Sequence, residues 1–184
     1  MPNWCSNQLT LKHKDPRRVD LAVLAFNNGK FFETFVPLPD GKWNYDFCVT
    51  KWGTKWDVGG SRNDDEIDRP DRNTAIFVFD SAWAPPVGVY EAMCSEGYEI
   101  EAFYDEPGMA FCGKIVGNEH EWDDDYREYG SVGPEAIRTI VGEELDDFYG
   151  LTERMAEWYS DVEDDEQELI DELERIRNLG PHTD

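Results

Sequence analysis

Three histidines are the side chains of this sequence best suited to catalysis. His13, His120 and His182 are far apart, and none stands in a Ser or Cys nucleophile pattern. The chain also lacks a glycine-rich phosphate loop and a dinucleotide fingerprint. We therefore predict a protein that is not an enzyme and that binds no cofactor. The alternative is an enzyme whose site is assembled in space around His13 or His120.

The four cysteines offer little metal or redox chemistry by their spacing. They are Cys5, Cys48, Cys94 and Cys112, and no Cys-x-x-Cys pair is among them. This spacing argues against a zinc knuckle or a redox pair. Because cysteine packs well as a small apolar residue, we predict buried free thiols.

An acidic segment offers oxygen ligands for a divalent cation. Glu119–His120–Glu121 is followed by Asp123, Asp124 and Asp125, and hard carboxylate oxygens with one imidazole are a donor set that such a cation accepts. The spacing fits no calcium-loop pattern, since no glycine occupies the turn and no glutamate closes it. A solvated acidic turn without a metal is the interpretation that we favour.

Aromatic residues crowd the segment 40–60, above all at Trp52–Gly53–Thr54–Lys55–Trp56. Gly53 would let the backbone turn, and Lys55 would present a charge between two indoles, which describes a ligand-binding surface. The alternative is core packing, in which Trp52 and Trp56 anchor a loop over a sheet. We favour packing, because indoles are the largest apolar groups available to a small core.

Negative charge is concentrated in the last third of the chain. The net charge is −24, and residues 119–184 carry 23 acidic residues against five arginines. This composition opposes phosphate binding, including an RNA-recognition sheet, because such binding needs clustered Lys or Arg. We expect a basic protein partner instead. The carboxylates expected to face it are Asp123, Asp124, Asp125, Glu143, Glu144, Asp146, Asp147, Asp161, Glu163, Asp164, Asp165, Glu166, Glu168, Asp171 and Glu172.

The elements that position these residues follow from hydrophobic spacing and turn signals. Strands are predicted at 8–12, 74–80, 98–104 and 109–116, helices at 16–26 and 87–96, a short strand or loop at 31–36, and a charged connection at 61–73. This order indicates an α+β fold, a ferredoxin-like split βαβ antiparallel sheet with one extra hairpin strand and two helices on one face.

The residues after 118 have a different character. Apolar residues at three- and four-residue spacing predict acidic amphipathic helices at 134–149, 151–159 and 161–178, with a capping box from Ser160 to Glu163 opening the last. We therefore predict a ferredoxin-like domain over residues 1–118 and an acidic helical annex over 119–184 that packs on it.

Four spaced motifs resemble a known family. They are Met1–Asn7, Trp52–Asp57, Ala82–Pro86 and Tyr104–Gly108, the last followed by Phe111 and Gly113. In this order they resemble the YubB ferredoxin-like domain family of phage and plasmid accessory proteins, over about residues 1–117. The resemblance implies the fold and a mobile-element origin, and it brings no catalytic residues to carry over.

Charge and resemblance together predict a phage- or plasmid-encoded binding protein. Its acidic surface would mimic nucleic acid and inhibit a basic host defence protein, such as a CRISPR effector or a restriction enzyme, in the bacterial cytosol. One alternative is that the acidic helices only keep the protein soluble. Another is a small-ligand or metal-binding accessory domain built on residues 52–56 and 119–125. Neither a signal sequence nor an apolar stretch of 18 residues is seen, so no membrane association is expected.

Overall fold

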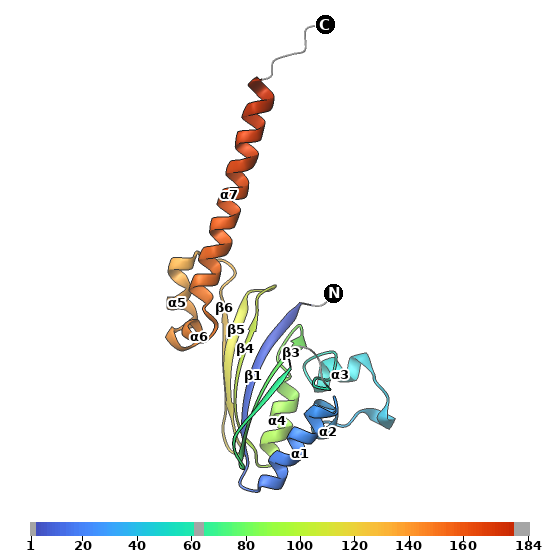
Figure 1. Cartoon of the computed structure of the whole chain (residues 1–184). Coiled ribbons are helices and arrows are strands. Elements are labelled where there is room, and N and C mark those ends of the chain that lie inside the picture. The colour runs from blue at the N-terminus through green and yellow to red at the C-terminus, as the bar shows by residue number, and fades with distance from the viewer. Residues whose placement is uncertain (1–2, 61–64, 179–184) are drawn as a thin grey trace. The chain divides into compact units, whose positions relative to one another are not determined.

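The computed structural model describes residues 3–60 and 65–178. The chain divides into two compact units, Met1–Gly130 and Ser131–Asp184, and each is described by itself. The first unit contains a six-stranded antiparallel sheet and the second contains helices only (Figure 1).

The sheet has the strand order β2-β3-β1-β4-β5-β6. Its strands are β1 (Trp4–Lys12), β2 (Glu66–Asp71), β3 (Thr74–Ala82), β4 (Glu99–Glu106), β5 (Phe111–Gly117) and β6 (Trp122–Glu128). The first four strands have the order of a ferredoxin-like split βαβ fold, and β5 and β6 extend the edge beyond β4. The chain is therefore an α+β protein with a ferredoxin-like sheet.

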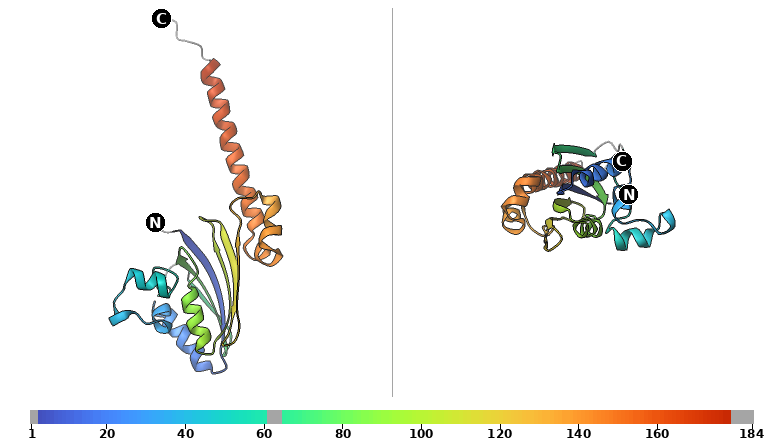
Figure 2. Two further views of the ribbon diagram at one scale, coloured as in Figure 1. Left: turned by 180° about the vertical axis from the view of Figure 1, so that it is seen from behind. Right: turned by 90° about the horizontal axis from the view of Figure 1, so that it is seen from below.

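Helices cover one face of this sheet. In the first unit they are α1 (Pro16–Asn27), α2 (Phe31–Phe35), the short 3-10 helix η1 (Pro39–Gly41), α3 (Tyr45–Lys51) and α4 (Val87–Ser95). Figure 2 shows that α1 and α4 lie against the same face. Because side chains alternate along a strand, the odd-numbered residues of β1, such as Leu9 and Leu11, point to the helices and are fully buried. Phe77 and Phe79 of β3 stand beside them and contact Phe26 of α1 and Phe31 of α2.

The cysteines are buried free thiols, as the sequence predicts. Cys5 and Cys112 are completely inaccessible, and Cys94 is nearly so. Burial raises the pKa of Cys94 to about 11 and raises that of Cys5 further. Thiolates at these two positions are therefore rare at neutral pH, and both cysteines serve as small apolar residues.

The second unit consists of three consecutive helices. They are α5 (Pro134–Val141), α6 (Glu143–Tyr149) and α7 (Leu151–Asn178). Gly142 and Gly150, both with positive φ, separate them. The apolar side chains of Ile137, Leu145 and Leu151 are buried where the three helices contact one another.

Five segments differ from the sequence-based prediction. The single helix predicted at 134–149 is divided at Gly142 into α5 and α6. The charged connection at 61–73 contains the strand β2, residues 122–128 form β6 rather than annex, and residues 31–35 form α2 rather than a strand or loop. The predicted helix start at Ser160 is wrong, because α7 runs through it without a Gly or Pro. Both missed strands lie at sheet edges, where charged residues and proline are tolerated, so their composition is that of a loop.

The predicted domain boundary after residue 118 also differs from the observed division at Gly130. The boundary lies later in the chain because the acidic residues 122–128 form the strand β6 of the first unit. This strand pairs with β5 along its whole length, from Trp122 opposite Gly117 to Glu128 opposite Phe111. The packing of the acidic helices on the ferredoxin-like domain stays a prediction.

A carboxylate distant in sequence holds α2 in place. Asp57 accepts hydrogen bonds from the backbone N–H groups of Phe32 at 2.7 Å, Glu33 at 2.9 Å and Val58 at 2.8 Å. The N–H groups of Phe32 and Glu33 belong to the first turn of α2, a helix of only five residues, and Asp57 satisfies them from outside the helix. Burial raises the pKa of Asp57, and the three N–H donors oppose that effect.

Asp57→Ala is expected to lower the free energy of unfolding by about 1–3 kcal/mol, because it leaves the donors at the start of α2 without a charged acceptor. Urea unfolding followed by circular dichroism measures the change. Asp57→Asn keeps one acceptor oxygen and should lose less. Asp123→Asn, at an exposed position of β6 in the same unit, is the matched control and should change nothing. Equal stability of the Ala variant and the wild type would contradict this role.

Candidate functional site

Four sequence motifs meet at one end of the sheet. β1 begins at Trp4 opposite Ala82, where β3 ends, and Ser6 pairs with Asp105 near the end of β4. The segment 52–56 joins this end, since Thr54 Oγ1 donates to the carbonyl oxygen of Ala82 at 2.8 Å. The antiparallel register thus brings together the motifs 3–7, 52–57, 82–86 and 104–108, which are far apart in the sequence.

The buried polar members of this group have structural roles. The Asn7 amide Nδ2 donates to the carbonyl oxygen of Cys5 at 2.7 Å and to Ser81 Oγ at 2.8 Å. Asn7 Oδ1 accepts from the Tyr90 hydroxyl at 3.4 Å. These contacts link β1, β3 and α4 inside the core, where polar groups must be paired. Asn7 itself presents no group to solvent, since it is 1% exposed.

Residues 52–54 pack in the core, the interpretation that the sequence favoured. Trp52 is 1% exposed, and its indole Nε1 donates to the carbonyl oxygen of Val36 at 2.8 Å. Gly53 has φ 89°, and a Cβ there would lie 3.0 Å from the carbonyl oxygen of Pro85. The loop therefore comes so close to the start of α4 that glycine is required at this position.

Lys55 and Trp56, by contrast, are half-buried and lie beside other aromatic residues. Lys55 Nζ lies 4.2 Å from the ring centroid of Trp56, 5.4 Å from that of Trp83 and 5.9 Å from that of Tyr45. Trp4 contacts Trp56 at 6.1 Å between ring centroids, and Trp43 Nε1 donates to the carbonyl oxygen of Lys55 at 3.1 Å. We call Trp4, Trp43, Tyr45, Trp56 and Trp83 the aromatic cluster.

The aromatic cluster remains accessible although its rings touch one another. Trp4 is 43% exposed, Trp43 53%, Tyr45 45% and Trp83 38%. Rings that hold an ammonium group through their faces form a cation–π arrangement. Core packing therefore accounts for Trp52 but not for the cluster around Lys55, which is a candidate binding surface.

Trp83 adopts a backbone conformation that is rare for its residue type. Its φ is 73°, in the left-handed region, and its N–H donates to the carbonyl oxygen of Asn3 at 2.9 Å. A bulky side chain in this region costs on the order of 1–2 kcal/mol. Strain of this kind gathers at functional sites, where surrounding contacts enforce it.

The carboxylates proposed as metal ligands are dispersed by the alternation of β6. Asp124 accepts a hydrogen bond from the Tyr104 hydroxyl at 2.8 Å on the helix-covered side of the sheet. Asp123 and Asp125 point to the other side, where Asp125 pairs with Arg127 at 2.5 Å. Across the described ranges 3–60 and 65–178, no group of three or more His, Cys, Asp or Glu side chains is placed to hold a metal ion.

His13 serves the start of α1. Its Nδ1 accepts from the N–H of Asp15 at 2.9 Å, and its ring packs on Tyr98 at 4.9 Å between centroids. Asp15 in turn caps α1 by accepting from the N–H of Arg17 at 3.0 Å. His120 is exposed in the turn before β6, and His182 lies outside the described residues.

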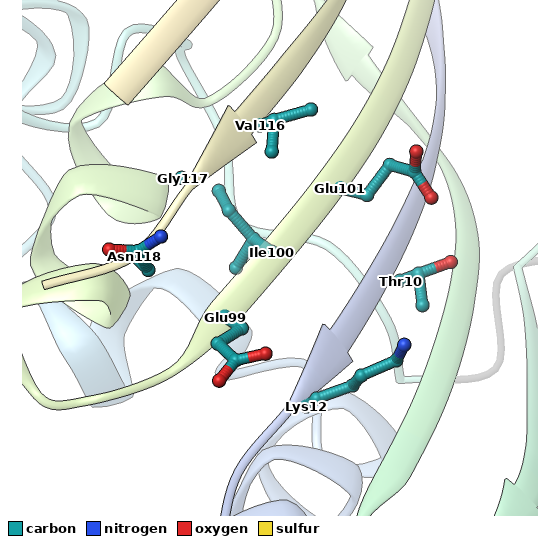
Figure 3. Close-up of a pocket in the computed structure, with 8 residues that line it drawn as sticks. All are labelled: Thr10, Lys12, Glu99, Ile100, Glu101, Val116, Gly117 and Asn118. Atoms are coloured by element: carbon teal, nitrogen blue, oxygen red, sulfur yellow. The ribbon is translucent and has the colours of Figure 1, made fainter. Parts of the chain in front are cut away.

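A pocket on the side of the sheet opposite α1 and α4 is small for a ligand. Figure 3 shows its lining on three neighbouring strands and the residue after β5: Thr10, Lys12, Glu99, Ile100, Glu101, Val116, Gly117 and Asn118. Its volume is about 170 Å³, whereas small-molecule sites usually measure roughly 300–1,000 Å³. Glu101 is also engaged in an ion pair with Lys114 at 2.9 Å.

Three acidic residues of α6 are tied to one arginine. Arg138 of α5 pairs with Glu143 at 2.7 Å, Asp147 at 2.6 Å and Asp146 at 3.2 Å. Hydrogen bonds to Asp147, Glu143 and Asp146 raise the pKa of this guanidinium. Three of the four carboxylates of α6 are therefore held in ion pairs within the unit, and the one arginine offsets one of their negative charges.

Asp146 is buried rather than exposed, which corrects the expectation that it faces a partner. It is 3% exposed and accepts from the N–H of Thr152 at 2.8 Å and from its hydroxyl at 2.9 Å. These bonds satisfy donors in the first turn of α7. Asp146 is thus a capping residue, and it leaves the set of partner-facing carboxylates.

The remaining partner-facing carboxylates lie mostly on α7. Exposed acidic residues of this helix are Glu153, Glu157, Asp161, Asp164, Asp165, Glu166, Glu168, Asp171 and Glu172. The side chain of Glu163, also predicted to face a partner, lies outside what the structure describes. Asp123 to Asp125 belong to the first unit, and Glu144 is exposed on α6.

The sheet order and the helices on one face define a ferredoxin-like α+β protein. The family model of the "Ferredoxin-like domain in Api92-like protein" matches residues 51–148. The chain belongs to this family. The match begins later and ends later than the predicted range 1–117, so it takes in β6, α5 and most of α6 but not α7.

A solved structure is also similar to the chain. It is the protein api92 from Yersinia pseudotuberculosis, with 11% sequence identity and a TM-score of 0.48, and the similarity covers 72% of this chain and 99% of that one. None of the curated proteins compared with the chain matches it. No described helix is both long enough and apolar enough to span a bilayer.

Substitution of Trp83 tests the strain at the aromatic cluster. Trp83→Gly is expected to have a free energy of unfolding about 1 kcal/mol higher than Trp83→Ala, because only glycine adopts φ 73° without cost. Trp43→Gly and Trp43→Ala form the matched pair, since Trp43 is exposed and has no positive φ. There the Ala variant should be at least as stable. Urea midpoints give both differences, and the same order at both positions would contradict the argument.

Proposed function

We propose that this chain is a non-enzymatic binding protein whose helix α7 presents an acidic face to a basic, nucleic-acid-binding protein. The observation that carries the proposal is the row of carboxylates at Glu157, Asp161, Asp164, Glu168 and Asp171, all exposed. Their spacing alternates between four and three residues, which places them within about 80° of the helix circumference. One side of α7 is therefore acidic over most of its length.

The charge density of α7 matches one nucleic-acid strand better than a duplex. The helix has 28 residues, 11 of them acidic and three basic, and spans about 42 Å at 1.5 Å per residue. One DNA strand carries about 12 phosphates over that length and a duplex about 25. The proposed mimicry is thus of a single strand.

The acidic face costs the helix stability. Glu157 and Asp161, and likewise Asp164 and Glu168, are like charges at i and i+4, an arrangement that weakens a helix by a few tenths of a kcal/mol per pair. A basic partner would relieve this repulsion, and the field of the helix would speed association at low salt. Solubility alone requires charge but not its alignment on one face.

The finer parts of the proposal rest on charge and on the motifs of the sequence. Those motifs resemble the YubB family of phage and plasmid accessory proteins, a setting in which host defence enzymes are natural targets. We therefore propose that the partner is a CRISPR effector, a restriction enzyme or a similar protein, inhibited because α7 competes for its nucleic-acid channel.

The test reverses charge on the acidic face and, as a matched control, elsewhere. The quadruple variant D161K/D164K/E168K/D171K should bind fluorescent 20-residue polylysine at least ten-fold more weakly than the wild type at 50 mM salt, measured by anisotropy. It should also fail to displace a 20-nucleotide single strand from polylysine. The control E91K/E99K/E119K/E121K carries the same change of net charge on exposed positions of the first unit, none of them among the carboxylates predicted to face the partner.

Equal weakening in the two quadruple variants would show that only net charge matters, and would leave solubility as the role of α7. Pull-downs from host lysate with the wild type and both variants then identify the partner as the protein that the α7 variant alone loses.

A second candidate function is small-ligand binding at the aromatic cluster, favoured by the three rings around the Lys55 ammonium. A thermal-shift screen with divalent cations and nucleotides tests it. On this alternative, a ligand raises the melting temperature of the wild type, and Trp83→Ala removes that rise. If no ligand raises the melting temperature, the aromatic cluster serves packing alone.

A further inference from the structure

The side of α7 away from its acidic face carries exposed apolar residues. Trp158 is 55% exposed, Tyr159 37%, Leu169 61%, Ile170 50% and Leu173 57%. Residues 11 positions apart lie almost directly above one another, since 11 residues make close to three turns. Trp158 and Leu169, Tyr159 and Ile170, and Val162 and Leu173 are such pairs. We call these six residues the apolar stripe.

The other helices of the second unit do not cover the apolar stripe. α5 has eight residues and α6 seven, whereas α7 has 28. Figure 1 shows α7 continuing well beyond both of them. Leu151 at its start is buried, but the described side chains from Ala156 onward are exposed apart from the half-buried Val162. An apolar row of this kind on a soluble helix is typical of an interaction surface.

Carboxylates border and interrupt the apolar stripe. Asp161, Asp165 and Glu172 lie along one border, and Glu166 falls within the stripe, 11 residues after Met155. A second copy of α7 would bring two such rows together, and like charges flanking an apolar seam oppose pairing. A partner helix with lysines or arginines beside its own apolar residues would satisfy both the stripe and its borders.

We propose that the apolar stripe binds a basic amphipathic helix of the partner protein. This inference rests on the proposed function, because it assumes a basic partner and specifies the element that α7 contacts. The stripe spans 15 residue steps from Trp158 to Leu173, about 23 Å, which fits a partner helix of about 15 to 20 residues. Binding by helix pairing needs apolar side chains at i, i+3, i+4 and i+7 on the partner.

The probe is a pair of 18-residue Leu/Lys peptides of identical composition. In one peptide the leucines follow i, i+3, i+4, i+7 spacing, and in the other they are spread around the helix. Anisotropy at 150 mM salt should give the amphipathic peptide a Kd at least ten-fold lower than that of its isomer. The variant L169Q/L173Q should remove this preference, whereas Leu24→Gln, at an exposed leucine of α1, should retain it. Circular dichroism is the check that both variants keep the fold.

Three outcomes would overturn the inference. Equal binding of the two peptides by the wild type would mean attraction by charge alone, and the proposed function would stand without the stripe. Failure of both peptides to bind would count against the stripe and the proposed function together. Self-association in sedimentation, lost in L169Q/L173Q, would identify a second copy as the occupant.

Discussion

The ferredoxin-like unit depends on the central position of β1, which pairs with β3 on one side and β4 on the other. Both pairings are antiparallel, and each joins strands separated by more than sixty residues of sequence. Asn7 fixes this arrangement from inside the core, because its amide bonds reach β3 and the Tyr90 hydroxyl of α4 bonds to it. A buried amide of this kind is costly unless all partners are in place, so it favours one register over its neighbours.

The same register produces the aromatic cluster. Trp4 opens β1 opposite the end of β3, and Trp83 follows that end directly. Thr54 fastens the loop that carries Lys55 and Trp56 to β3, and Gly53 allows the loop to approach α4. Exposed rings are thus held by buried neighbours, which is how a surface site becomes rigid without being in the core.

How far the sequence predicts this structure depends on how local each signal is. The apolar run at 74–80 predicts β3, and Asp15–Pro16 predicts the start of α1, since burial and capping are read within a few residues. β2 and β6 escape prediction because edge strands carry the charge and proline of loops. α2 escapes it because its capping carboxylate, Asp57, comes 25 residues after Phe32. Of the candidate sites, the motif 52–56 can be recognised in the sequence. The sequence does not show which of its residues lie in the core and which lie at the surface.

Nothing in Ala82–Trp83–Ala84 signals a left-handed tryptophan, because the strain comes from the contacts that Asn3 and the cluster impose. The burial of Asp146 is equally hidden. In sequence it is one acid among four, and only the positions of Arg138 and Thr152 distinguish it. Acidic composition therefore predicts where negative charge accumulates, but not which carboxylates hold the unit together.

The distinction between buried and exposed carboxylates matters for α7, because a buried carboxylate positions the exposed ones. Asp146 caps the first turn of α7 and bonds to Arg138, so it fixes where the helix starts relative to α5 and α6. From that start, the helical repeat determines that Asp161, Asp164 and Glu168 share one side and Leu169 and Leu173 another. A shift of the start by one residue would turn both faces by about 100°. The buried carboxylate of Asp146 therefore determines the direction in which the acidic face and the apolar stripe point within their unit.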